Sequence, residues 1–303
     1  MSILRLSSGT PIEDVPGIVN ITGATNVGTS RAFNNGAVDV AFTKGAIGGI
    51  PVSYTVTSSP SNLTTTGSSS PLRVTGLIGN SPYTFTATAT SASGYVTPVS
   101  LPSASVLVST IPNAPVFSAP TSVRGGRAYA NGAIDVPLSC SSGGSPVLSY
   151  TVVSTPGSIS VAGTSAVRIT GLTGGTSYTF AATATNANGT STSTTYSTGT
   201  VALTVPQAPT IGTITKVGTT VTVPFTAGSN GGTAVTKYTL SYIYDDGDPE
   251  YSGEAGEDSG TFTGTVSPIT FKVPRAGFPY TFTLTATNAE GTSLSSAPVV
   301  KAL

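Results

Sequence analysis

Short segments with alternating apolar and polar residues run along the chain. In "GAVDVAF" at 36–42, Val and Phe alternate with Ala and Asp. In "YTFTATAT" at 83–90, Tyr, Phe and Ala alternate with threonines. A period of two is typical of a strand with one face in a core, and Thr suits the half-exposed face. No segment has helical periodicity, so the pattern predicts an all-β protein built of sandwiches or barrels.

Turn signals separate these segments. Gly and Asn favour the left-handed backbone of tight turns, and such pairs recur between the alternating runs. They are Asn35-Gly36, Gly48-Gly49, Gly79-Asn80, Asn131-Gly132, Gly143-Gly144, Asn188-Gly189 and Asn230-Gly231-Gly232.

The segments recur as a long internal repeat. "NNGAVDVAF" at 34–42 returns as "ANGAIDVPL" at 130–138. "YTFTATATSASG" at 83–94 returns as "YTFAATATNANG" at 178–189 and, more divergently, as "YTFTLTATNAEG" at 280–291. A unit of roughly 95 residues is the size of an independently folding domain.

Pro-containing segments at 109–115 and 203–209 mark the domain boundaries, because Pro stiffens a connector. We predict three domains at 16–111, 112–205 and 206–303, preceded by an N-terminal docking segment at 1–15. Short stiff links predict an extended rod.

The composition excludes most classes of catalytic and metal site. The chain has 12 basic and 12 acidic residues, no His, no Trp and a single Cys. Without His there is no imidazole base or Ser-His-Asp triad, and one Cys cannot form a thiolate cluster. Zero net charge argues against a nucleic-acid partner, and no apolar run is long enough to span a bilayer. We therefore expect no catalytic residues, and we read Cys140 as a small apolar residue beside a strand.

The repeat resembles the fibronectin type III family. Its signature of Leu, five residues and Tyr, followed by "TFxxxAxNxxG", occurs from Leu77 to Tyr83 and from Leu172 to Tyr178, while the third copy keeps Tyr280 without the Leu. The resemblance implies immunoglobulin-like β-sandwiches in which these tyrosines form a corner, with the hydroxyl bonded back to the preceding loop. The family usually has a Trp in its second strand. The aligned residues here are Phe42, Leu138 and Phe225, which implies a lighter core.

One insertion of the third copy, at 245–258, collects seven of the twelve acidic residues. Oxygen ligands of this kind suit Ca²⁺, with Asp245, Asp246, Asp248 and Glu250 as the candidate site, although the spacing is not that of an EF-hand. The preferred interpretation is a solvated hairpin whose charge keeps an otherwise neutral rod soluble. We expect no other cofactor.

Tyrosines flank the same insertion. Tyr242, Tyr244 and Tyr251 are candidate contacts for sugar rings or for a protein partner. Alternate tyrosines at 242 and 244 are also what one face of a sheet would show. Arg73 and Arg168 occupy equivalent positions in copies one and two and are read as surface strand residues.

The resemblance extends to Thr- and Gly-rich copies found in bacteriophage virion proteins and bacterial surface proteins. The N-terminus lacks the apolar stretch of a secretory signal, so the expected location is a virion released by lysis. The expected function is a non-enzymatic accessory structural protein of a bacteriophage, as a head decoration or fibre or a tail appendage. Its expected partners are capsid or tail proteins, host surface glycans and further copies of itself. The alternatives are a bacterial surface adhesin or spacer and the non-catalytic arm of a polysaccharide-acting system.

Overall fold

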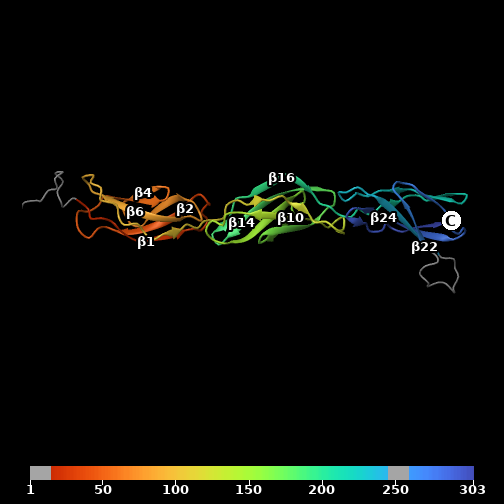
Figure 1. Ribbon diagram of the computed structural model, residues 1–303, viewed down its shortest axis with the longest axis horizontal. Coiled ribbons are helices and arrows are strands. Elements are labelled where there is room, and N and C mark those ends of the chain that lie inside the picture. The colour runs from red at the N-terminus through yellow and green to blue at the C-terminus, as the bar shows by residue number, and fades with distance from the viewer. Residues whose placement is uncertain (1–14, 245–258) are drawn as a thin grey trace, which may run out of the picture.

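The computed structural model describes residues 15–244 and 259–303. These residues form three β-sandwiches that follow one another end to end along one long axis (Figure 1). All the regular structure in the described chain is β-strand, which confirms the predicted fold class.

The first sandwich packs a sheet of order β1-β2-β5 against a sheet of order β4-β3-β6-β7. The pairing of β2 with β5 shifts register between Gly36 and Ala37. Ala37 is therefore buried, where strict alternation would point it outward. The strands are β1 (Asn20–Val27), β2 (Gly36–Thr43), β3 (Ser53–Ser59), β4 (Thr64–Gly67), β5 (Leu72–Leu77), β6 (Pro82–Thr90) and β7 (Val106–Leu107).

The second sandwich repeats this plan with a longer final strand. One sheet has the order β13-β10-β8, with β9 also on β10, and the other has the order β12-β11-β14-β15, with β16 also on β14. The strands are β8 (Val116–Phe117), β9 (Thr121–Ser122), β10 (Gly132–Ser139), β11 (Val147–Thr155), β12 (Ser160–Gly163), β13 (Ala166–Leu172), β14 (Ser177–Asn186), β15 (Gly189–Thr190) and β16 (Thr194–Val201).

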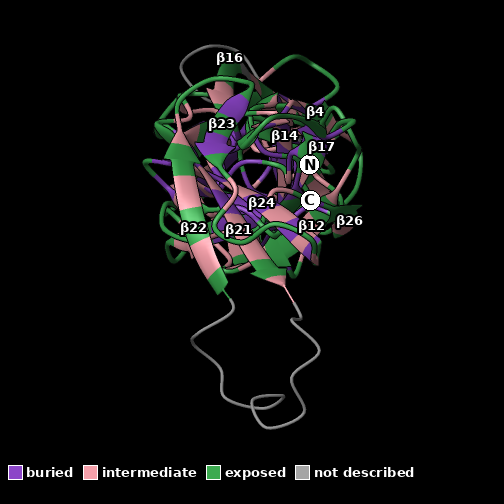
Figure 2. Cartoon of the chain, turned by 90° about the vertical axis from the view of Figure 1, so that its right-hand side faces the viewer, coloured by how far each residue is buried: buried purple, intermediate pink, exposed green. Residues whose placement is uncertain are grey.

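The third sandwich divides its first sheet into β17-β20 and β18-β19-β23 and keeps the second as β22-β21-β24-β25, with β26 on β24. Figure 2 looks along the rod onto this end, where β22 lies beside its hairpin partner β21. The strands are β17 (Thr210–Ile211), β18 (Thr215–Val217), β19 (Thr220–Val223), β20 (Phe225–Thr226), β21 (Lys237–Tyr244), β22 (Ser259–Gly264), β23 (Ile269–Lys272), β24 (Pro279–Asn288), β25 (Gly291–Thr292) and β26 (Val299–Ala302).

Each sandwich has a core of its own. The buried residues of the three cores come from 19–108, 134–202 and 211–303. Fully buried rings such as Phe85 and Phe282 each contribute about 1.5–3 kcal/mol by leaving water. The predicted boundaries at 111/112 and 205/206 fall between these cores.

In the first and third sandwiches, the residue where the family usually has Trp packs against a tyrosine of the facing sheet. The ring of Phe42 lies 4.7 Å from that of Tyr54, and Phe225 lies 4.5 Å from Tyr238. In the second sandwich Leu138 has this position, and both it and Cys140 pack against the core, with Cys140 Sγ 3.5 Å from the Tyr150 hydroxyl. Burial, helped by that contact, raises the pKa of Tyr150 to about 12. Cys140 thus packs against the core as a small side chain.

Hydroxyl residues join the last segment of each sandwich to its central strand. Ser100 donates its backbone N–H to the carbonyl of Ala87, and its Oγ accepts the N–H of the same alanine. The hydroxyl then donates to the next carbonyl in its own chain, at Leu101. The side chain therefore replaces a backbone acceptor, which lets a Pro-containing segment pair with a regular strand. Residues with the same reciprocal pair are Thr97, Ser103, Ser191, Ser293 and Ser296.

Candidate functional site: the joints between the sandwiches

The three corner tyrosines bind the loop before them in the same way. The hydroxyl of Tyr83 accepts the N–H of Ile78, and that of Tyr178 accepts the N–H of Thr173. Tyr280 accepts the N–H of Arg275 and donates to its carbonyl. Burial raises the pKa of Tyr280 above its ordinary value. Each corner ties the crossover loop to a core strand, which is a structural role.

Tyr242 and Tyr244 face the core of the third sandwich. The ring of Tyr242 lies 5.7 Å from Tyr280 and 5.4 Å from Phe262, and that of Tyr244 lies 4.8 Å from Tyr280. Tyr242 also lies across Gly260, its direct partner on β22. Their alternation in sequence thus reflects one inner face of β21, and packing accounts for both rings without a partner molecule.

The acidic insertion at 245–258 lies outside the described residues. This applies to Tyr251 and to the candidate calcium ligands Asp245, Asp246, Asp248 and Glu250. Within the described ranges no three His, Cys, Asp or Glu side chains come together as a metal site. Nor does that part of the chain contain a helix able to cross a membrane.

The most elaborate polar arrangement lies between the first and second sandwiches. Thr110, which is fully buried, donates its N–H to the carbonyl of Gly143 at 2.7 Å. Its own carbonyl accepts the side-chain amides of Asn186 at 2.8 Å and Asn188 at 3.1 Å. Asn186 also donates to the carbonyl of Ser142 at 2.8 Å. One buried asparagine of the second sandwich therefore holds the last residue of the first.

The same arrangement recurs between the second and third sandwiches. Buried Thr204 donates its N–H to Gly231 at 2.9 Å, and its carbonyl accepts the side-chain amide of Asn288 at 2.9 Å. Asn288 again makes a second bond to the facing loop, to the carbonyl of Asn230 at 2.7 Å. We call these two sets of contacts joint 1 (Thr110, Gly143, Asn186) and joint 2 (Thr204, Gly231, Asn288).

Joint 2 carries an ion pair that joint 1 lacks. The Glu290 side chain is 2% exposed and accepts hydrogen bonds from Arg124 Nη2 at 2.5 Å and from the N–H of Gly125 at 3.1 Å. The equivalent positions in joint 1 are Gly28 and Asn188, and a Cβ on Gly28 would meet the Asn188 side chain. The backbone carbonyl at this position accepts an N–H in both joints. At joint 2 the carbonyl of Glu290 accepts the N–H of Gly126, and at joint 1 the carbonyl of Asn188 accepts that of Ser30.

The joint has two halves, and they are unevenly distributed along the chain. The upstream half is a loop, at 28–35 in the first sandwich and 123–131 in the second. The third sandwich instead closes β18 onto β19 with the tight turn Gly218-Thr219. The downstream half is the turn that begins at Asn186 or Asn288. The first sandwich has Ser91 at that position, and its hydroxyl bonds within the same turn to Ser93 and to the N–H of Tyr95. Of the three, the second sandwich alone carries both halves in the described chain.

The sequence interpretation missed these residues. In the sequence, Asn186 and Asn288 stood out only as part of the family signature. The linker threonines, Thr110 and Thr204, were only part of the Pro-containing segments. A signal was present, because the first copy reads "SASG" where the other two read "NANG" and "NAEG". The arginines read as surface residues also have partners. Arg73 binds Asp39 with both nitrogens at 2.7 and 2.8 Å, and Arg168 binds Asp135 in the same way.

Strand order and the repeated tyrosine corner define the chain as three tandem fibronectin type III-like sandwiches. No family model and no curated protein matches the sequence. Among solved structures, the crystal structure of the chicken CNTN1 FN1-FN3 domains covers 95% of this chain and 99% of its own, with 17% sequence identity and a TM-score of 0.36.

Proposed function

We propose that the chain is a non-enzymatic structural rod, an accessory protein of a bacteriophage virion that holds its ends at a fixed separation. The observation that supports this most strongly is the duplicated joint. A chain with flexible linkers would leave its linker carbonyls to water. Here Thr110 and Thr204 are buried and bonded on both sides, so neighbouring sandwiches have one preferred orientation.

The virion assignment is the finer part of the proposal. It is supported by the Thr- and Gly-rich repeats, the low proportion of charged residues and the lack of the usual catalytic constellations. In this role the segment 1–15 and the first sandwich dock on the particle, and the third sandwich projects with its acidic insertion.

Incorporation into purified particles tests this role. Mass spectrometry should find the chain in virions, and deletion of residues 1–15 should abolish its binding to purified capsids or tails. A matched chain that lacks 245–258 should still bind. If the protein is absent from particles and is recovered with the cell envelope, the surface adhesin or spacer becomes the better interpretation.

A further inference from the structure

Each joint also shapes a groove on the side of the rod. The groove at joint 2 has a volume of about 350 Å³, and the groove at joint 1 about 280 Å³. These volumes lie near the lower end of the range of about 300–1,000 Å³ for small-molecule sites. Both grooves use equivalent positions of the repeat, so the chain presents the same feature twice.

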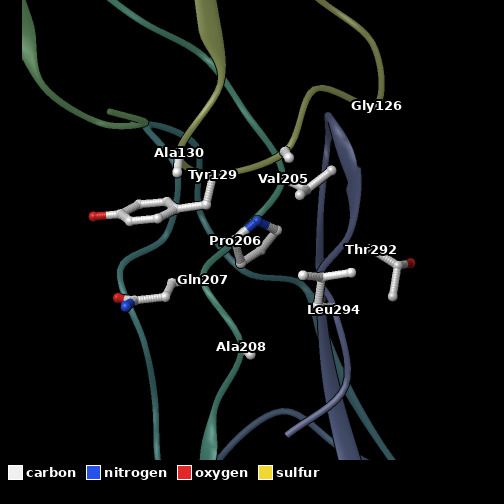
Figure 3. Close-up of a pocket in the computed structure, with 10 residues that line it drawn as sticks. Gly126, Tyr129, Ala130, Val205, Pro206, Gln207, Ala208, Thr292 and Leu294 are labelled. Carbon is white, nitrogen blue, oxygen red and sulfur yellow. The ribbon is translucent and has the colours of Figure 1, made fainter. Parts of the chain in front are cut away.

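Three side chains give each groove its character. At joint 2 they are Tyr129 from the upstream loop, with Pro206 and Gln207 from the linker. In Figure 3, Pro206 lies between Tyr129 and Leu294, and Gln207 lies on the same side as Tyr129. At joint 1 the equivalent residues are Phe33, Pro112 and Asn113. An aromatic ring, a buried proline and an exposed carboxamide therefore recur at both sites.

The joint fixes both walls of the groove. The carbonyl of Tyr129 accepts the N–H of Gly174 on the upstream side, and the N–H of Gln207 donates to the carbonyl of Ser229 on the downstream side. At joint 1 the carbonyl of Phe33 accepts the N–H of Gly79, and Asn113 donates to Ser141. Because the backbones on both walls are held, ligand binding would require little ordering, which favours affinity.

The lining selects a class of ligand. None of the described residues that line either groove is charged, so the ligand is neutral. The ring offers an apolar face to the C–H face of a sugar, and a carboxamide both donates and accepts, as hydroxyl groups do. A peptide could not pair as an added strand at joint 2, since Pro206 has no N–H and those of Val205 and Gln207 are bonded. Tyr129 Oη has no hydrogen-bond partner within the described chain and remains available.

We propose that the two grooves bind a neutral polysaccharide, with one short segment of the glycan stacked on Tyr129 and one on Phe33. This goes beyond the proposed structural role, because it gives the rod a ligand and places the contacts at the joints. Two equivalent grooves on one rigid rod engage a repeating polymer together, which raises its affinity over that of a short oligosaccharide by effective concentration.

The test uses the full chain and a printed array of neutral and acidic glycans, followed by calorimetry with the best tetrasaccharide and its polymer. We expect neutral glycans to bind and the polymer to bind more tightly. Tyr129→Ala and Gln207→Ala should each weaken tetrasaccharide binding at joint 2 by about tenfold and leave one unchanged site at joint 1, and Phe33→Ala with Tyr129→Ala should remove binding at both. Tyr95→Ala, an aromatic truncation remote from both joints, should leave it unchanged.

Three results would overturn the proposal: no glycan bound by the wild-type chain, binding that survives Phe33→Ala with Tyr129→Ala, or preferential binding of a decaproline peptide in the same grooves. Circular dichroism and unchanged particle incorporation of the variants separate loss of glycan binding from loss of fold and from failure of the virion role.

Discussion

A few side chains determine how each sandwich meets the next. Asn186 and Asn288 each satisfy two carbonyls that the joint buries, and an unpaired buried carbonyl costs about 1–3 kcal/mol. A shorter side chain would leave those carbonyls unpaired, and water would enter the joint. The residue type therefore follows from the geometry of two acceptors facing one amide.

The ion pair at joint 2 gives a prediction at this scale. Arg124→Ala should loosen joint 2 by about 2 kcal/mol, because the buried Glu290 carboxylate keeps only the N–H of Gly125. Arg124→Gly combined with Glu290→Asn recreates the pair found at joint 1 and should restore much of the loss. Amide exchange at Gly125 and Gly126 measures the opening. Equal exchange in Arg124→Ala and the wild type would contradict this account.

The strand ion pairs predict a dependence on pH. The Arg73 guanidinium, bonded to Asp39, holds the pKa of that carboxyl below its ordinary value of 3.8, and Arg168 does the same for Asp135. A lowered folded-state pKa stabilises above 3.8, and the contribution is lost as the pH falls through the folded-state value.

Asp39→Asn with Asp135→Asn should therefore lower the melting temperature of the first two sandwiches near neutral pH, and the difference from wild type should vanish at about pH 2. The third sandwich has Thr222 opposite Thr270 at the equivalent position and serves as an internal control. A difference that persists unchanged in acid would show that charge is not its cause.

At the scale of the element, the serine pairing explains why the last segments of the first and third sandwiches pair without regular strand structure. Ser296 accepts the N–H of Leu284 in a buried position. Ser296→Ala should leave that N–H without its acceptor, destabilise the third sandwich by about 1–3 kcal/mol and speed exchange of the Leu284 amide. The exposed neighbour offers a matched control, since Ser295→Ala should have no effect. Unchanged exchange of the Leu284 amide in Ser296→Ala would contradict this role of the serine hydroxyl.

How far the sequence predicts these elements depends on the element. Regular strands such as 83–90 are visible because alternation reports one buried face. The segment 97–105 is not, because its serines and threonine pair every third residue and its prolines break the pattern. The corner tyrosines come from the family signature. The joints could not be predicted from one copy, since their asparagine side chains bind linker carbonyls 76 to 84 positions away. They become visible only when the copies are compared.

At the scale of the whole molecule, the uneven distribution of joint halves predicts which copy can be repeated. The second sandwich carries both halves, so duplicating residues 112–205 in tandem should give a longer, equally straight rod, as small-angle X-ray scattering would show by its maximum dimension. The new joint would place Arg124 opposite Asn188. Duplicating 206–303 should instead give a bend or a flexible link, because the third sandwich has the tight Gly218-Thr219 turn in place of the upstream loop. Equal straightness of the two duplications would contradict this assignment.

We infer that the joints make one rigid rod of three sandwiches. Pulsed electron resonance across joint 1 tests it most directly, with spin labels at Thr66→Cys and Thr164→Cys, both exposed, in a Cys140→Ser background. We predict a single narrow distance distribution that broadens when Asn186→Ala is added. A broad distribution in the chain with Asn186 intact would contradict the rod.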